Sequence, residues 1–166
     1  MGVRIPRAAQ YSDIAQLVEQ AVDNHLLSCY KYGMSNTKAV GERSEGMVLA
    51  ALLRAGKVVL QPFGDNQRYD LVVDDKGRFL RLQCKTGRFK DGAILFDACS
   101  SQAHRGKGKQ DYRGQIEMFA VYYPDMDTVY MVPVEDVGRT SGRLRLEAPK
   151  NGQSKGIRLA DSYLLK

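Results

Sequence analysis

Three polar side chains, Asp70, Gln83 and Lys85, fall within the stretch RYDLVVDDKGRFLRLQCKTGR, which runs from residue 68 to residue 88. Mg²⁺ prefers several oxygen ligands, with carboxylates from separate elements, and it also accepts amide and carbonyl oxygens. An ammonium group beside such an ion could stabilise a bound phosphate or an activated water. These residue types therefore indicate a metal-assisted reaction on an anionic substrate, provided that the fold brings them together.

The pattern of this stretch predicts a β-hairpin, because two runs of strand-forming residues flank the turn letters DDKG. If the loop is even in length and centred on those letters, Asp70 pairs with Arg81. Side chains alternate between the faces of a strand, so Asp70 shares one face with Arg81, Gln83 and Lys85. Gln83 is then diagonal to Asp70, about 7–8 Å away. The other face takes the apolar residues Leu71, Val73, Leu80, Leu82 and Cys84, and a slip by one residue would bury Arg81 and Gln83.

A helix expected from Gly41 to Ala55 brings a further carboxylate within reach of the hairpin, because its apolar residues have helical spacing. Glu45 on this helix and Asp70 could supply two carboxylate ligands to one cation. The side-chain oxygen of Gln83 and the backbone carbonyl of Cys84 could supply two more.

Two simpler interpretations stay open at this point. The polar residues of the hairpin could be only its solvated face. Glu42 precedes Glu45 by three residues and shares its helix face, so it is the alternative carboxylate, although an acid near the N-terminus of a helix is also favourable by itself.

The remaining pattern predicts short strands and loops rather than a second domain. The order of a helix, then strands, then mixed elements favours an α/β or α+β fold over an all-β fold. The predicted strands span residues 57–60, 93–96, 119–123 and 129–132, a polar basic loop spans 100–110, and the tail from 138 to 156 is expected to add a hairpin.

The ordered set of motifs resembles the PD-(D/E)xK nuclease superfamily, and within it the branch that includes homing endonucleases encoded by group I introns in tRNA genes. The motifs are GERSE at 41–45, YDLVV at 69–73, RLQCKTGR at 81–88, YRG at 112–114 and VPVED at 132–136. The resemblance implies a restriction-endonuclease-like core with a mixed central sheet flanked by helices. It also implies hydrolysis of DNA phosphodiesters with Mg²⁺, or alternatively Mn²⁺, as the cofactor.

The resemblance assigns catalytic roles to Glu45, Asp70, Gln83 and Lys85, with the first three and the Cys84 carbonyl as metal ligands. Gln83 replaces the usual acidic residue, which removes one negative charge from the metal site and weakens coordination by that side chain. A Tyr instead of a Pro precedes Asp70, which removes no ligand.

The positive charge of the chain is concentrated beside these motifs. From Lys76 to Arg113 there are ten basic and three acidic residues, so this segment carries +7, whereas the whole chain carries +6. Such a patch attracts a phosphate backbone regardless of sequence. The residues predicted to contact nucleic acid are Arg81, Arg88, Lys90, Ser101, Arg105, Lys107, Lys109 and Arg113; Ser101 and Arg113 come from the resemblance.

Double-stranded DNA is the expected partner, and a homodimer or homotetramer is expected because one active site cuts one strand. The alternatives are a DNA- or RNA-binding module that lost cleavage, with Gln83 as the trace of that loss, and a Holliday-junction resolvase or restriction-type nuclease.

The first 33 residues raise a separate question, because VRIP at 3–6 and IAQLVEQ at 14–20 can be back-translated into T-arm and D-arm sequences of tRNA genes. An amphipathic helix from Asp13 to Leu27 is the alternative. We therefore predict an extension at 1–33 and a single nuclease-like domain at 34–166. With three cysteines, no signal-peptide pattern and no apolar run of about 20 residues, a cytoplasmic protein without a membrane span is expected.

Overall fold

The single α-helix in the described part of the chain, α2 (Thr37–Arg54), begins earlier than the predicted Gly41. The reason is Asn36, whose side-chain oxygen accepts hydrogen bonds from the backbone nitrogens of Lys38 and Ala39 at 3.1 and 3.3 Å. An Asn in this position satisfies backbone donors that the first helical turn leaves without partners.

The computed structural model describes residues 36–64, 66–101, 108–148 and 156–166. Residues 41–166 form one compact unit, which holds every strand described. The predicted extension at 1–33, Arg105 and Lys107 lie outside the described residues. No described helix is long and apolar enough to cross a membrane.

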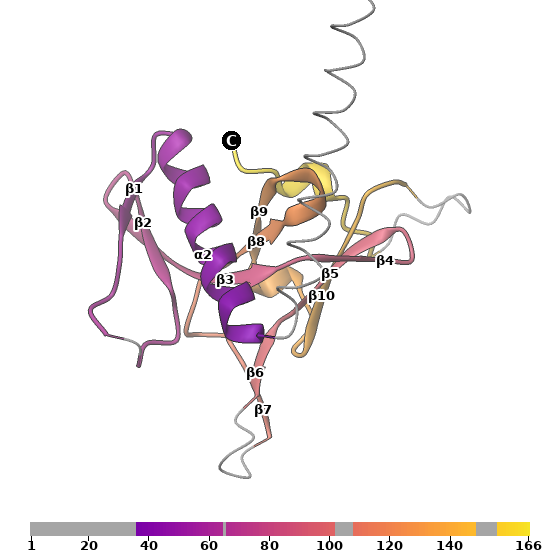
Figure 1. Cartoon of the computed structure of the whole chain (residues 1–166), viewed down its shortest axis with the longest axis horizontal. Coiled ribbons are helices and arrows are strands. Elements are labelled where there is room, and N and C mark those ends of the chain that lie inside the picture. The colour runs from indigo at the N-terminus through magenta and orange to yellow at the C-terminus, as the bar shows by residue number, and fades with distance from the viewer. Residues whose placement is uncertain (1–35, 65, 102–107, 149–155) are drawn as a thin grey trace, which may run out of the picture. The chain divides into compact units, whose positions relative to one another are not determined.

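The central sheet has five strands in the order β1-β2-β3-β8-β9 (Figure 1). Its neighbours are antiparallel except β3 and β8, which are parallel. The sheet is therefore mixed, as predicted. The strands are β1 (Val58–Leu60), β2 (Leu71–Asp75), β3 (Arg78–Thr86), β8 (Met118–Tyr123) and β9 (Thr128–Pro133).

Helix α2 covers one face of this sheet and lies over β3 in Figure 1. Its buried residues Val48 and Leu52 pack in one cluster with Leu71, Leu82 and Ala120 of the strands. The burial of Leu71, Val73, Leu82 and Cys84 confirms the predicted apolar face of the hairpin. This helix therefore holds the hairpin by the face that does not carry Asp70.

A smaller sheet, in the order β10-β5-β4, packs against the other face of β8 and β9. Its strands are β4 (Arg88–Lys90), β5 (Ala93–Asp97) and β10 (Ser141–Arg145). Gly142 of β10 is required there, because an added Cβ would lie 2.1 Å from the ring of Phe96. The α+β prediction is confirmed, although a second sheet, not a helix, covers this face in the described residues. The predicted tail hairpin is wrong in its pairing, since β10 pairs with β5.

The hairpin register differs from the prediction. Asp75 pairs with Arg78, so the turn has two residues, Lys76 and Gly77, with φ of 55° and 87°. Two positive φ values define the turn type whose twist matches antiparallel strands, and Gly tolerates the second without strain. The centre of the loop thus shifts by one residue, and Arg81 pairs with Val72 rather than with Asp70. Every side chain nevertheless keeps its predicted face.

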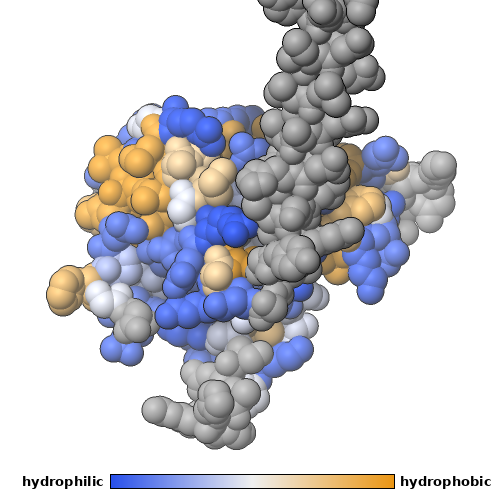
Figure 2. Space-filling view, in the orientation of Figure 1, coloured by the Kyte–Doolittle hydropathy of each residue, from blue (hydrophilic) through white to orange (hydrophobic). Residues whose placement is uncertain are grey.

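The other elements are short. A two-stranded ribbon of β6 (Cys99–Ser101) and β7 (Lys109–Asp111) replaces the ends of the predicted 100–110 loop. Three 3₁₀ turns complete the described elements, at Pro124–Met126, Val134–Asp136 and Ala160–Tyr163. Figure 2 shows apolar side chains gathered where β1 and the end of α2 lie, and the large exposed ones on these elements are Leu53, Val58 and Leu60.

Candidate active site

Asp70 and Gln83 lie next to each other at the end of the hairpin. The backbone nitrogen of Asp70 donates to the carbonyl of Leu82 at 2.8 Å, which continues the pairing of β2 with β3. Asp70 Oδ2 accepts hydrogen bonds from Gln83 Nε2 and, at 2.7 Å, from the backbone nitrogen of Cys84. The predicted diagonal placement of Gln83 is therefore wrong, and the contact is direct. Because the amide donates through its nitrogen, its oxygen is the end suited to a cation.

Lys85 lies on the same side of β3 as Gln83. Its Nζ donates to the hydroxyl of Tyr112 at 3.3 Å and lies 4.9 Å from the centroid of that ring. The positive charge of Lys85 also lowers the pKa of Asp70, although burial is the largest effect and raises that pKa above its ordinary value. The hairpin thus brings a desolvated carboxyl group, an amide and an ammonium group together.

Glu45 completes this group from helix α2. Partial burial raises the pKa of the Glu45 carboxyl, and the negative charges of Asp70 and Glu42 raise it further. A raised pKa means that the ionised form is held at a cost, which a bound cation would offset. Glu45, Asp70, Gln83 and Lys85 are called the acidic corner below.

A hydrogen bond between two hydroxyl groups, one of them buried, joins the helix to the strand beside this corner. Ser44 is the one buried polar or charged residue in the described part of the chain, with an exposed fraction of 2%. Its Oγ lies 2.6 Å from Oγ1 of Thr86, which directly follows Lys85 on β3. The neighbour of Glu45 is therefore bonded to the neighbour of Lys85, so this bond joins helix α2 to β3 beside the acidic corner.

The donor set of the acidic corner fits a hard divalent cation. Glu45 and Asp70 bring two carboxylates, and the negative charge of Asp70 raises the pKa of Glu45. The Gln83 side-chain oxygen and the Cys84 carbonyl are neutral oxygen donors of the kind that Mg²⁺ accepts. Within the described residues, no group of three or more His, Cys, Asp or Glu side chains could hold a metal. A cation here would depend on neutral oxygens and on the substrate phosphate.

Both candidate helix acids line one hollow of about 240 Å³, together with Gly46, Leu49 and Gln61. Glu42 and Glu45 thus reach the same open space, and the charge of Asp70 raises the pKa of Glu45. The Cys84 thiol lies on the helix side and is buried, which raises its pKa well above the ordinary value, so it is not a ready nucleophile or soft metal ligand.

The residues predicted to bind nucleic acid fall into groups with different surroundings. Lys90 and Lys109 are exposed, and so is Arg88, which forms an exposed ion pair with Asp97 at 3.2 Å. Ser101 ends β6 opposite Lys109. Arg81 instead makes a two-pronged ion pair with Glu117, with bonds of 2.6 and 3.1 Å, and the same bonding lowers the pKa of Glu117.

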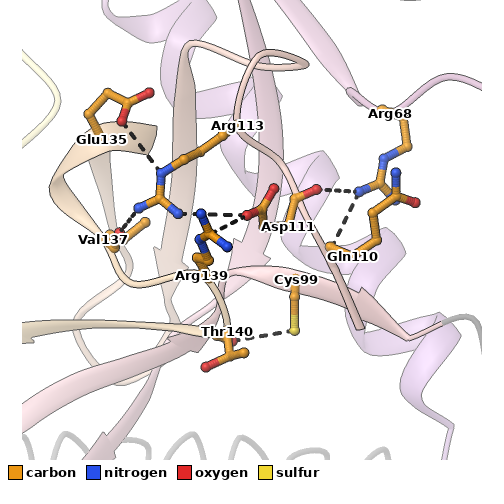
Figure 3. A network of polar contacts seen from close by, with 9 residues as sticks. All are labelled: Arg68, Cys99, Gln110, Asp111, Arg113, Glu135, Val137, Arg139 and Thr140. Atoms are coloured by element: carbon orange, nitrogen blue, oxygen red, sulfur yellow. Dashed lines mark hydrogen bonds and ion pairs between the residues drawn. The ribbon is translucent and has the colours of Figure 1, made fainter. Parts of the chain in front are cut away.

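Arg113 lies among acidic groups and a backbone carbonyl (Figure 3). It donates to the carbonyl of Val137 at 2.7 Å and pairs with Glu135 at 3.5 Å and Asp111 at 3.7 Å. Arg139 also lies 3.7 Å from the Asp111 carboxylate. Asp111, Arg113, Glu135 and Arg139 are called the arginine cluster below, and they tie β7 to the segment after β9.

Sequence reasoning missed three contributors: Arg68, the Ser44–Thr86 pair and Tyr112. Ser44 lies in the motif GERSE and Tyr112 lies in the motif YRG, but residue spacing does not indicate what they contact. Arg68 donates to Gln115 and Ser100, both at 2.6 Å, and its carbon Cζ lies 4.2 Å from the Tyr112 ring centroid. These contacts join residues that are more than 25 positions apart, so only the fold reveals them.

Comparison with known proteins identifies a family and a shared fold. The family model described as "PD-(D/E)XK endonuclease" matches residues 35–166. Among solved structures, a bacterial homing endonuclease, I-Ssp6803I, superposes with a TM-score of 0.55 at 20% identity, covering 78% of this chain and 86% of that one. No curated protein matches the sequence. At this identity the structural match shows a shared fold.

Proposed function

Since this chain belongs to the PD-(D/E)XK endonuclease family, we propose that it is a metal-dependent DNA endonuclease that hydrolyses phosphodiester bonds. The observation that carries the proposal is the acidic corner, where Asp70 contacts Gln83 and its charge raises the pKa of Glu45. Carboxyl groups with perturbed pKa values cluster at functional sites.

Each residue of the site has a distinct proposed role. Glu45, Asp70, the Gln83 oxygen and the Cys84 carbonyl would hold Mg²⁺, or alternatively Mn²⁺. When bound, such an ion polarises a phosphoryl oxygen and lowers the pKa of a water molecule. The Lys85 ammonium would orient the attacking water or stabilise the extra negative charge on the phosphoryl group. The hydrogen bonds from Gln83 and the Cys84 nitrogen would keep the Asp70 carboxylate in one orientation.

Double-stranded DNA is the proposed substrate, and it would approach over the exposed basic residues Arg88, Lys90 and Lys109. We propose that Ser101, Arg105 and Lys107 contact phosphates beside them. Arg81 and Arg113 would contribute only if the substrate drew them from Glu117 and the arginine cluster. Changing Arg105, Lys107 and Lys109 to Ala should flatten the salt dependence of binding by roughly one unit of slope per lost contact. An unchanged slope would remove this loop from the interface.

Site-specific cleavage for the mobility of an intron is the finer proposal, with a cytoplasmic homodimer or homotetramer as the active form. In the described residues β1 pairs only with β2, and its residues Val58, Val59 and Leu60 carry no charge, so this edge suits a second copy. Val58→Lys should reduce the mass of the oligomer in analytical ultracentrifugation. A parent that sediments as a monomer at every concentration would contradict the assembly.

Cleavage of supercoiled plasmid DNA with Mg²⁺ at modest salt tests the activity. The proposal predicts nicked or linear products that disappear when EDTA removes the metal. Binding without cleavage would favour the alternative, a catalytically weakened DNA- or RNA-binding module, for which the neutral Gln83 is the supporting observation. Preference for branched over linear DNA would instead favour a Holliday-junction resolvase, and a short palindromic target would favour a restriction-type nuclease.

We also propose that the nuclease domain spans 34–166, since the family match begins at residue 35. A chain starting at Met34 should keep the melting temperature and activity of the parent. A large loss of either would show that residues 1–33 belong to the fold.

A further inference from the structure

Tyr112 is buried next to the acidic corner and lies close to two cationic side chains, Arg68 and Lys85. Its exposed fraction is 4%, and its ring packs edge-on against Phe119 at a centroid distance of 5.6 Å. Arg68 Cζ lies 4.2 Å and Lys85 Nζ lies 4.9 Å from the ring centroid. A cation within about 6 Å of an aromatic ring is attracted to its face. The ring therefore binds both residues.

Arg68 holds this ring in place. Besides its bonds to Gln115 and Ser100, its guanidinium donates to the backbone carbonyl of Asp111 at 3.0 Å. These partners lie on both sides of Tyr112 in the sequence. A guanidinium bonded in three directions has little freedom, so the tyrosine stacked on it is a rigid support.

Lys85 gains direction from this support. A lysine side chain has four flexible carbons and loses considerable rotamer entropy when it is fixed. The Tyr112 hydroxyl accepts a hydrogen bond from Lys85 Nζ at 3.3 Å, whereas no ion pair joins Lys85 to Asp70, although both residues are described and the Lys85 charge lowers the pKa of Asp70. The ammonium group is thus close to the carboxylate but not in contact with it.

We propose that Tyr112 is a positioning residue, whose hydroxyl holds the Lys85 ammonium away from Asp70 and leaves it available to the scissile phosphate or its attacking water. This inference rests on the proposed nuclease function. The Lys85 charge already lowers the pKa of the Asp70 carboxyl. Without the hydroxyl, an ion pair between Lys85 and Asp70 would occupy both groups at once. The hydroxyl therefore acts on turnover, and DNA affinity depends on other residues.

Tyr112→Phe is the decisive variant, because it removes only the hydroxyl and keeps the ring packed between Phe119 and Arg68. Tyr163→Phe is the matched control, since the Tyr163 hydroxyl donates to Asp136 at 2.9 Å and has no contact with the acidic corner. The single-turnover rate of plasmid cleavage at saturating protein should fall about tenfold or more in Tyr112→Phe, as expected for a lost hydrogen bond to a charged group. DNA affinity and melting temperature should match those of the parent, and Tyr163→Phe should cleave at the parent rate.

A second measurement follows Lys85 without DNA or metal. In protein labelled with ¹³C-lysine, the Cε signal of Lys85, identified by its loss in Lys85→Arg, should be shifted by the Tyr112 ring. It should move toward the position of a free lysine in Tyr112→Phe, because the ammonium swings toward Asp70. An unmoved signal, or a moved signal with an unchanged cleavage rate, would overturn the inference. If the parent cuts no DNA under any metal, the proposed function fails, and a moved signal would still support the placement of Lys85 by Tyr112.

Discussion

The acidic corner and the arginine cluster are built from the same kinds of residues but use charge in opposite ways. In the arginine cluster, Arg113 pairs with Glu135 and Asp111, so positive and negative groups neutralise each other. In the acidic corner, burial and the charge of Asp70 raise the pKa of Glu45 above its ordinary value. The first arrangement stabilises the fold, and the second keeps charges at a cost to the fold. Sites that hold such unfavourable groups are where function and stability conflict.

The largest expected effect comes from Asp70→Asn. It removes one carboxylate of the acidic corner, so plasmid cleavage should fall at least about a hundredfold. DNA binding should stay equal or become slightly tighter, because a negative charge that faces phosphate is lost. Since burial raises the pKa of Asp70, the melting temperature at neutral pH should be equal to that of the parent or higher.

Asp75→Asn is the matched control, because Asp75 lies on the same hairpin, is exposed and pairs with Arg78 at the turn. It should cleave like the parent. Equal cleavage by the parent and Asp70→Asn would remove the acidic corner from catalysis.

Gln83→Glu should have the next largest effect on cleavage. It adds a third carboxylate to the acidic corner, which makes the corner differ still more from the neutralised arginine cluster. If this side chain binds the metal directly, its full negative charge should lower the Mg²⁺ concentration needed for half-maximal cleavage, or change which metal works best. Without metal the same variant should melt at a lower temperature, because a negative charge now lies against Asp70. A metal titration curve identical to that of the parent would show that Gln83 is not a ligand.

The acidic corner shows how far sequence reasoning reaches. Its three hairpin residues, Asp70, Gln83 and Lys85, follow from the alternation of side chains, which places them on one face for any turn with an even number of residues. The register did not follow, because the two-residue turn at Lys76 and Gly77 competes with longer turns that the letters DDKG also permit. The one-residue shift matters, since it places Gln83 in contact with Asp70.

The basic residues show where prediction from the sequence fails. The charge count correctly identified a positive segment, but it treated each Arg and Lys as equally available to DNA. Arg81 pairs with Glu117 and Arg113 pairs with Glu135, acids that are more than 20 residues away in sequence. The pairing of β3 with β8 brings Arg81 to Glu117. Local pattern cannot show how a side chain is satisfied by a distant element.

Arg113→Ala should break the arginine cluster. It should lower the stability of the fold and leave cleavage almost unchanged. It leaves Asp111 and Glu135 without their shared partner, so the free energy of unfolding should fall by about 1–3 kcal/mol. The melting temperature should drop by several degrees, while cleavage per folded molecule and the salt slope of DNA binding stay near those of the parent. A stable variant that binds DNA weakly would instead return Arg113 to the predicted nucleic-acid interface.

The smallest effect on the melting temperature is expected for a change at Glu117. Its ion pair with Arg81 should stabilise the fold in a way that depends on pH. The hydrogen bonds from Arg81 lower the pKa of Glu117 below its ordinary value of 4.5. A folded-state pKa that is depressed gives stability that is present above the unfolded pKa and is lost as pH falls through the folded one. Glu117→Gln should therefore melt below the parent at pH 7, by no more than about 4 °C for a partly exposed pair, and the gap should close as pH falls below about 4. Asp97→Asn is the control, because both side chains of the Asp97–Arg88 pair are exposed. This variant should melt at the temperature of the parent at every pH. If Glu117→Gln still melted below the parent at pH 3, side-chain packing, and not the charge of Glu117, would be what joins β3 to the start of β8.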